Sequence, residues 1–459
     1  MLPHKFLERM KTLLGSDFAA FLSALEGDAV RGLRVNTLKC SAKDFLEETT
    51  LPLRKTAYSE VGFILDSDEG VGKLCEHHSG RIYMQDPGAM APLSAIDIPL
   101  GARVVDLCAA PGGKSGQAAA MIGDGGFLLS NEFVPKRAKT LVSNFERLGI
   151  KCAVVTSMDT DRLPELFENY FDYAIVDAPC SGEGMFRKNS VAEEQWSEDN
   201  VRISAQRQRK ILANAAKLVR GGGYIIYSTC TYSKEENEMT VDAFLKDNPS
   251  FTLVPPKSSV AKVTAPAVSF PEVSAENLHF ARRFYPHLCE GEGQFFAIMQ
   301  KDFDGKTPTI LYKDASKPLS REESAAVNSF LKENLISPPD ARVAKVGENI
   351  VLIPHGVPPI PQGSVFMSGV LLGEIKKGRL LPSHQFFSAY ADFFIRKVEL
   401  SGNAESLEKY LCGEEISAPD ATLSGYCVLT YKGTALGGGK ASLGRIKNHY
   451  PKGLRNKRV

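Results

Sequence analysis

Two cysteines in this chain each come directly after an apolar stretch typical of a buried strand. Cys180 stands in Asp177-Ala-Pro-Cys-Ser-Gly182, and Cys230 stands in Ser228-Thr-Cys-Thr231. The carboxyl ends of parallel strands meet at one edge of a sheet, so we expect both thiols in one crevice. A cysteine is ordinarily a small buried apolar residue, but two of them at strand ends among turn residues indicate thiol chemistry.

A turn of small residues follows another predicted strand, which ends at Asp106. The next residues have almost no side-chain bulk before a predicted helix begins; they are Cys108, Ala109, Ala110, Pro111, Gly112, Gly113 and Lys114. Small side chains let backbone N–H groups approach a polar ligand, and a helix amino terminus adds partial positive charge. The turn therefore indicates a ligand site at the same edge of the sheet as the thiols.

Other interpretations of this turn are open from the residues alone. Gly113-Lys114-Ser115 matches the end of a phosphate-binding P-loop, but Cys108 stands where that loop needs glycine. The dinucleotide pattern G-x-G-x-x-G is absent, and an ordinary tight turn would also favour Gly and Pro. Glu132 ends the second predicted strand about twenty residues beyond the glycines, where an acid commonly binds ribose hydroxyls. This acid favours a nucleoside-bearing cofactor.

Two thiols beside such a cofactor suit one class of reaction. Carbon 5 of a pyrimidine is a poor nucleophile until a thiolate adds at carbon 6 and converts the ring into an enamine. After methyl transfer the carbon 5 proton must leave and the thiol must be eliminated, and a second cysteine could assist. Asp177 could hydrogen-bond the base edge, and the base would have to leave its stack. Spacing alone does not order the two thiols.

The elements that must position these residues alternate regularly between apolar runs and amphipathic spacing. The predicted strands are 103–106, 127–131, 153–156, 171–176, 224–227 and 293–299, and the predicted helices are 114–121, 135–148, 206–219 and 235–246. A glycine turn at 221–223 is expected before the strand at 224–227. The alternation predicts an α/β fold with a doubly wound, mostly parallel sheet.

Both flanks of this sheet have features of interest. Residues 1–28 have the apolar spacing of amphipathic helices. The segment 31–39 alternates apolar with basic or amide side chains, which predicts a half-exposed strand suited to phosphate contacts or a solvated edge strand. The last segment, 440–459, has seven Lys or Arg and no acid, so it is either a solvated tail or a phosphate-contacting surface.

Composition limits the class of protein. The 459 residues are 43% apolar with a net charge of +1, enough for two or three domains and not basic throughout. No apolar run is long enough for a membrane span, and charges interrupt the start, so we expect a cytoplasmic protein. Nine cysteines without a C-x-x-C pair suit free thiols. The cluster Cys75-Glu-His-His78 lacks a matching second cluster, so no metal site is expected.

Three motifs together resemble one known family. Asp106–Lys114, Asp177–Gly182 and Ser228–Thr231 are similar, in this order, to the cofactor and catalytic motifs of the S-adenosylmethionine-dependent RNA (cytosine-5) methyltransferases, the Sun-domain family. The resemblance continues through Arg34–Thr37 and 283–297, and so covers roughly the first two thirds of the chain. Later stretches resemble bacterial members that modify small-subunit ribosomal RNA and end in a PUA-type module; they are 182–188, 440–441 and 448–452.

The resemblance implies a class I methyltransferase fold, Rossmann-like with a mostly parallel seven-stranded sheet, and S-adenosylmethionine as the cofactor. It implies that residues 108–114, Glu132, Asp159 and Asp177 surround this cofactor. It also implies that Cys230 is the nucleophile and that Cys180 assists product release. In DNA cytosine-5 methyltransferases the attacking cysteine follows a proline, which here would be Cys180.

We therefore expect an N-terminal helical, RNA-contacting segment at 1–95, a catalytic domain at 96–302, and a C-terminal α+β RNA-binding region, PUA-like at its end, at 303–459. The expected activity is methylation of a cytosine at carbon 5 in 16S ribosomal RNA, free or in the small subunit. The enzyme is expected to be a monomer without a membrane, metal or protein partner. The alternatives are a transfer RNA substrate, a non-catalytic RNA-binding assembly factor, and a P-loop nucleotide hydrolase.

Overall fold

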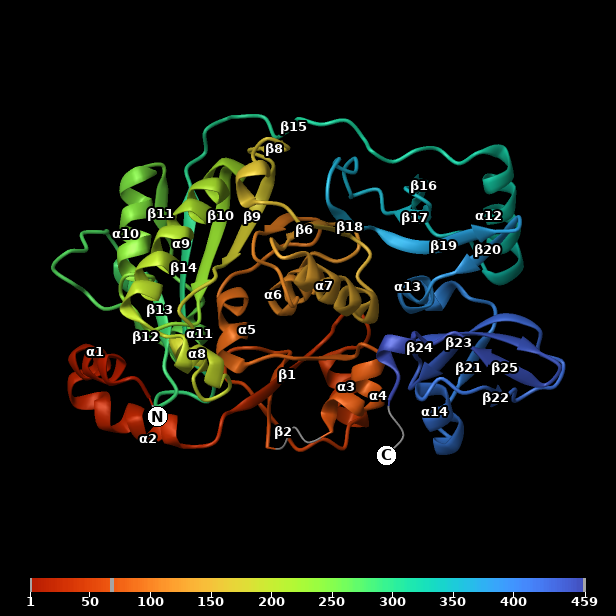
Figure 1. Ribbon diagram of the computed structural model, residues 1–459, viewed down its shortest axis with the longest axis horizontal. Coiled ribbons are helices and arrows are strands. Elements are labelled where there is room, and N and C mark those ends of the chain that lie inside the picture. Colours follow the sequence, from red (N-terminus) through yellow and green to blue (C-terminus); the bar gives the residue numbers. More distant parts are fainter. Residues whose placement is uncertain (1, 67–69, 457–459) are drawn as a thin grey trace.

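A computed structural model describes residues 2–66 and 70–456 of the protein. A central sheet with helices on both faces has an N-terminal segment along one end and a C-terminal region with sheets of its own to one side (Figure 1). None of the helices in the described part of the chain is long and apolar enough to cross a membrane.

The N-terminal segment begins with the two predicted amphipathic helices, α1 (His4–Leu14) and α2 (Phe18–Glu26). A small antiparallel sheet follows, in the order β2-β3-β1-β4. Its strands are β1 (Arg31–Val35), β2 (Leu53–Lys55), β3 (Gly62–Leu65) and β4 (Ile82–Met84). The helices around it are α3 (Ala42–Glu48), α4 (Cys75–His78) and α5 (Pro87–Ser94).

Strand β1 is buried, which corrects the expectation of a half-exposed strand suited to phosphate contacts. Arg34 and Asn36 are each only 1% exposed. Arg34 Nε donates to Gln85 Oε1 at 3.0 Å, and Asn36 Nδ2 donates to the carbonyl oxygens of Gly80 and Leu148. Because buried polar groups need such partners, neither side chain faces solvent, and Asn36 joins the N-terminal segment to the central domain through Leu148.

The central sheet has the strand order β12-β13-β14-β10-β9-β5-β6-β7-β18, with β11 paired to β14. Five strands run parallel; they are β5 (Arg103–Asp106), β6 (Phe127–Asn131), β7 (Ala153–Thr156), β9 (Phe171–Asp177) and β10 (Val219–Thr229). The others pair antiparallel; they are β11 (Phe251–Leu253), β12 (Ala265–Pro266), β13 (Arg282–Phe284), β14 (Gln294–Lys301) and β18 (Val365–Ser368). The sheet has ten strands, not the seven that the resemblance implied.

Alternate side chains of the parallel strands fill two separate cores. Val104 and Leu128 pack with α6 and α7 on one face, whereas Val105 and Leu129 pack with α9 and α10 on the other. The helices that cover the sheet are α6 (Gly113–Ile122), α7 (Pro135–Leu148), α9 (Glu198–Leu218) and α10 (Glu238–Asp247). Two short helices, α8 (Ser190–Glu194) and α11 (Ser258–Ala261), lie in the connections. The doubly wound sheet is confirmed, and it places the carboxyl ends of its parallel strands along one edge.

Several predicted spans agree with the structure residue for residue, namely 127–131 with β6, 135–148 with α7 and 153–156 with β7. The glycine turn expected at 221–223 is wrong. β10 begins at Val219, and its pairing with β9 is interrupted between Val219 and Tyr224, so the glycines form an irregular stretch inside the strand.

The C-terminal region contains two further sheets, of which the second lies beside the N-terminal segment (Figure 1). The first has β16 (Arg342–Val346), β17 (Asn349–Ile353), β19 (Val370–Lys376) and β20 (Arg379–Pro382), with α12 (Arg321–Asn334) and α13 (His384–Ala389). The second has β21 (Lys397–Glu399), β22 (Ile416–Ser417), β23 (Gly425–Tyr431), β24 (Thr434–Ser442) and β25 (Arg445–Asn448), with α14 (Ala404–Leu411). A two-stranded ladder joins β8 (Phe167–Glu168) to β15 (Thr309–Ile310). Lys457 and Arg458 of the basic tail lie outside the described residues.

Candidate active site

The two cysteines singled out in the sequence lie side by side. β9 and β10 are parallel neighbours, with Ser228 opposite Asp177, so the loops that follow them emerge together. The Sγ atoms of Cys180 and Cys230 are 3.1 Å apart, and both residues are free, half-buried thiols. The hydrogen bond to Cys230 and burial raise the pKa of the Cys180 thiol well above its usual range. Cys180 is therefore held in its protonated form.

Side chains that the sequence analysis did not single out bridge the two loops that carry the cysteines. Ser181 Oγ lies 2.8 Å from Thr231 Oγ1, and the Ser181 N–H donates to Glu236 Oε2 at 3.0 Å. Gln208 Nε2 donates to the same Glu236 oxygen at 2.7 Å and to the Pro179 carbonyl oxygen at 3.0 Å. Burial raises the pKa of Glu236 to about 7.

The sequence has a weak signal for this network. Glu235, Glu236 and Glu238 lie in the first turn of the helix predicted at 235–246, and acids at such a position are typical of an exposed first turn. Glu236 and Glu238 are instead fully buried. Only the proximity of these acids to the Ser228–Thr231 motif could have indicated a role near the thiols.

Asp177 ends β9 and faces the turn of small residues. Lys114 Nζ lies 2.8 Å from Asp177 Oδ1, and Ser228 Oγ donates to the same oxygen at 2.7 Å. The Lys114 side chain is 7% exposed and that of Asp177 36% exposed. A partly covered ion pair therefore joins the turn of small residues to the strand that leads to Cys180.

The turn between β5 and α6 is built around Asp106 and a glycine. Asp106 accepts the Cys108 N–H at 3.2 Å and the Ser115 hydroxyl at 2.6 Å, and burial raises the pKa of Asp106 to about 7. Gly112 has φ +113°, and a Cβ there would lie 3.0 Å from the Leu141 side chain, so only glycine suits the position. No side chain in the described chain caps the amino end of α6, which leaves helix N–H groups for a ligand.

Two further acids follow the next strands of the sheet. Glu132, after β6, is 3% exposed and lies 3.3 Å from Arg137, whose guanidinium also donates to the Ala110 carbonyl oxygen at 2.8 Å. Arg137 thereby joins this acid to the turn. Asp159, after β7, is exposed, and its carboxylate accepts the Asp161 N–H at 3.1 Å. Carboxylates that accept ribose hydroxyls and a helix terminus that binds a carboxylate suit a nucleoside linked to an amino acid.

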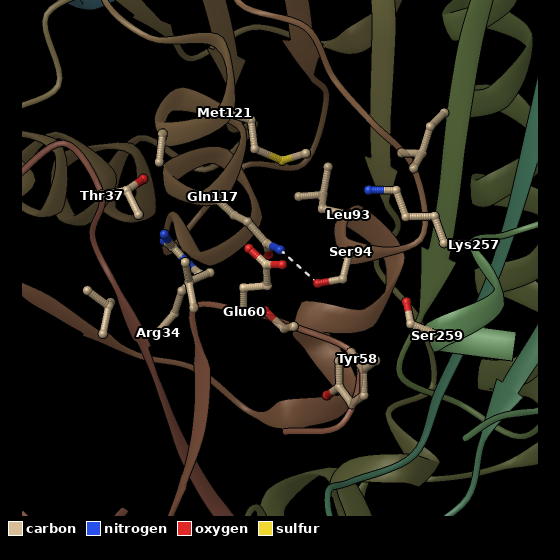
Figure 2. Close-up of a pocket in the computed structure, with 15 residues that line it drawn as sticks. Arg34, Thr37, Tyr58, Glu60, Leu93, Ser94, Gln117, Met121, Lys257 and Ser259 are labelled. Carbon is tan, nitrogen blue, oxygen red and sulfur yellow. Dashed lines mark hydrogen bonds between the residues drawn. The ribbon is translucent and has the colours of Figure 1, made fainter. Parts of the chain in front are cut away.

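A separate cavity of about 380 Å³ lies between the N-terminal segment and α6 (Figure 2). Arg34, Glu60 and Lys257 are among its lining residues, and Figure 2 shows the amide of Gln117 directed toward Ser94. None of its lining residues is a cysteine or belongs to the turn 108–114. The cavity therefore does not belong to the site formed by the thiols and the turn.

Comparison with known families divides the chain into four matched stretches. The description "16S rRNA methyltransferase RsmB/F" matches residues 96–300, and the N-terminal domain of 16S rRNA methyltransferase RsmF matches residues 2–87. The first C-terminal domain of RsmF rRNA methyltransferase matches residues 329–389, and the methyltransferase RsmF PUA domain matches residues 397–456.

Relatives are similar over nearly the whole chain. Ribosomal RNA small subunit methyltransferase F of Klebsiella pneumoniae is 32% identical over 98% of this chain and 96% of its own. The protein of the same description from Vibrio vulnificus is 30% identical over 99% of this chain and 97% of its own. A solved methyltransferase homolog from Pyrococcus horikoshii has a TM-score of 0.57 and 27% identity, covering 64% of this chain and 93% of its own.

Proposed function

The chain belongs to the RsmB/F family of 16S rRNA methyltransferases, and from this premise we propose that it methylates carbon 5 of a cytosine in 16S ribosomal RNA. The observation that carries the proposal is the pair of thiols, 3.1 Å apart, next to the ion pair of Lys114 and Asp177. An RNA-binding factor without activity would have no need of either. We further propose that the enzyme acts as a monomer, and that 1–95 and 303–459 contact the RNA around the catalytic domain at 96–302.

S-adenosylmethionine supplies an electrophilic methyl group when it is bound. We propose that the turn 108–114 and the amino end of α6 receive its carboxylate, because the helix N–H groups there have no side-chain cap. The carboxylates of Glu132 and Asp159 would accept hydrogen bonds from its ribose hydroxyl groups. The Lys114 and Asp177 ion pair would close the site toward the RNA base.

The thiols have different parts in the proposed reaction. Cys230 adds to carbon 6 of cytosine, forming an S–C bond and making carbon 5 nucleophilic. Asp177 hydrogen-bonds the base edge, and carbon 5 takes the methyl group. The carbon 5 proton then leaves to a water molecule, its electron pair forms the carbon 5–carbon 6 double bond, and the S–C bond breaks with its electrons on the Cys230 sulfur. Cys180, 3.1 Å away, assists this release by donating a hydrogen bond to that sulfur. This assignment of the two roles follows from the resemblance of the motifs to those of the family, and the 3.1 Å between the two Sγ atoms keeps Cys180 within reach of the adduct.

Incubation of the purified protein with methyl-labelled S-adenosylmethionine and a 16S rRNA transcript tests this proposal. We expect labelled 5-methylcytidine after nuclease digestion. Cys230→Ala should lose the activity by at least about 1,000-fold, because the covalent step is removed. Cys180→Ala should instead accumulate a protein–RNA adduct, seen as a shifted band on a denaturing gel. Cys412→Ala, a half-buried cysteine on the last domain, is the matched control and should behave as wild type.

Three outcomes would contradict the proposal. Methylation of transfer RNA but not of 16S rRNA would keep the chemistry and overturn the substrate. Wild-type turnover by Cys230→Ala would overturn the nucleophile, and adduct formation by Cys230→Ala rather than by Cys180→Ala would exchange the two roles.

A further inference from the structure

The hairpin formed by β24 and β25 has a leucine at its tip that the fold itself does not explain. Leu443 is 95% exposed and has φ +52°, and the next residue, Gly444, has φ +74°. Ser442 pairs with Arg445, so Leu443 and Gly444 are the two turn residues. Two-residue turns with positive φ at both positions favour Asn-Gly. A leucine in this conformation adds backbone strain and buries no apolar surface here.

The strands behind the tip place positive charges opposite each other. Lys440 on β24 lies directly opposite Lys447 on β25, and Tyr426 on β23 lies opposite Lys440. Lys440 Nζ is 5.1 Å from the centre of the Tyr426 ring. Like charges at facing positions destabilise a sheet. Both lysines are exposed, and no carboxylate in the described part of the chain pairs with either. We call Tyr426, Lys440 and Lys447 the basic row.

A single ligand would explain both the exposed Leu443 and the facing lysines. It would be a polyanion with apolar faces that covers the hairpin. Phosphate groups would relieve the repulsion between Lys440 and Lys447. An unstacked base would cover the exposed side chain of Leu443, since protein contacts to RNA favour loops and bulges whose bases are free of the helix. RNA is favoured over an acidic protein surface because the proposed substrate is RNA, and measurements on assembled small subunits distinguish the two.

We propose that the β24–β25 hairpin contacts RNA. In this contact Leu443 packs on an unstacked base, and the lysines of the basic row bind the adjacent phosphates. This inference rests on the proposed function, because it takes the RNA substrate from there. It adds a contact between the RNA and the last domain, whose residues are far along the chain from the cysteines and the cofactor turn.

Two substitutions separate this role from a structural one, because each favours the fold while it opposes RNA binding. Leu443→Asn places the preferred residue in the turn, so Tm should be unchanged or raised. Lys447→Glu replaces a like-charged pair by an opposite one and should also leave Tm unchanged or raised. Affinity for a 16S rRNA transcript, measured by filter binding, should fall about 5- to 10-fold in Leu443→Asn at all salt concentrations. In Lys447→Glu the affinity should fall about 10-fold at low salt. The slope of log affinity against log salt concentration should be smaller in magnitude by about one.

Leu100→Asn is the matched control, because Leu100 is 80% exposed and also precedes a glycine, Gly101, at the opposite edge of the sheet from the cysteines. It should bind RNA as wild type does. Wild-type affinity and salt slope in both hairpin variants would overturn the inference. So would variants that bind the naked transcript normally and lose activity only on assembled small subunits, since the tip would then contact a protein. If wild type methylates only transfer RNA, the proposed function fails, and the same variants are compared on that RNA.

Discussion

At the scale of single residues, a buried carboxyl group joins the two loops that carry the thiols. Glu236 accepts hydrogen bonds from Ser181 and Gln208, and Ser181 in turn bonds to Thr231. Because Ser181 follows Cys180 and Thr231 follows Cys230, this network joins the neighbours of both thiols. Glu236 is therefore a positioning residue for the pair of cysteines.

Glu236→Gln should slow methyl transfer about 10-fold, because an amide presents N–H groups to donors that need an acceptor. It should also change the dependence of stability on pH. Burial raises the pKa of Glu236 from 4.5 to about 7, so the folded protein holds this proton more tightly than the unfolded chain. The resulting stabilisation is complete below pH 4.5 and is lost as the pH rises through 7.

Melting temperatures between pH 5 and 8 measure this effect, and kcat for the transcript measures positioning. The Tm of Glu236→Gln relative to that of wild type should rise between pH 5 and 8, because the variant lacks the stabilisation that wild type loses as Glu236 ionises. Glu165→Gln, at an exposed carboxyl, is the control. A Tm difference between Glu236→Gln and wild type that does not vary with pH, together with an unchanged kcat, would refute the positioning role.

At the scale of elements, the strands and helices were predictable where one period dominates a segment. Pro135–Leu148 has a helical apolar stripe and begins with proline, and its helix agrees at both ends. The prediction of a half-exposed strand at 31–39 was wrong because contacts with distant residues outweighed the local pattern. Alternation of apolar and polar residues predicts a strand with one solvent-exposed face. Arg34 and Asn36 instead form hydrogen bonds with distant residues, and these bonds compensate for the burial of their side chains.

The cysteine loops are also held by a close approach of backbones. A Cβ on Gly184 would lie 2.5 Å from the Gly293 carbonyl oxygen, and a Cβ on Gly293 would overlap the Tyr232 ring. Gly184 belongs to the loop after Cys180, and Tyr232 to the loop after Cys230. The backbone just before β14 is therefore in contact with both loops.

Gly293→Ala should displace Tyr232 and lower kcat for the transcript about 10-fold or more, because small shifts of reacting groups are costly. Affinity for S-adenosylmethionine, measured by calorimetry, should change little, and Tm should fall by a few degrees, about 1–3 kcal/mol of overpacking. Gly402→Ala, where a Cβ would meet open space, is the control. Wild-type kcat in Gly293→Ala would show that this contact does not position the thiols.

At the scale of the whole molecule, the C-terminal region packs against the parts that precede it. β18 pairs with β7 at the edge of the central sheet. The two ring nitrogens of His78 lie 2.7 Å from the Tyr450 hydroxyl oxygen and 3.0 Å from Asn456 Oδ1. Lys39 of the N-terminal segment donates to Ser388, next to α13 residues that pack on α7. The N-terminal segment and the last domain therefore form one continuous structure beside the catalytic domain.

This junction should loosen in mild acid. Burial lowers the pKa of His78, and it lowers that of His384 to about 4 and that of His77 to about 3, from 6.5. For bases with lowered pKa values, the unfolded or undocked chain binds protons more readily, so stability is complete above pH 6.5 and is lost as the pH falls. Arg147 faces His77 and His78, and Lys39 faces His384, so protonation would also add like charges.

Small-angle scattering at pH 7.5 and pH 5 measures the docking. The radius of gyration of wild type should increase at the lower pH, and the increase should be smaller in His384→Gln, which cannot gain the charge. His355→Gln alters an exposed ring, 69% accessible, and should follow wild type. Equal radii at both pH values would show that the docking does not depend on these rings.

The sequence by itself determined the chemistry class and the sheet that carries it. The motifs 106–114, 177–182 and 228–231 are local patterns, and strand ends in a doubly wound sheet share an edge whatever the rest of the chain does. Only the tertiary structure decided that the two thiols lie 3.1 Å apart, that Glu236 bridges the two loops, that Arg34 is buried, and that Leu443 stands unsupported at a hairpin tip. Each of these depends on contacts, or on the lack of them, between residues far apart in sequence, and no local pattern encodes which distant groups will meet.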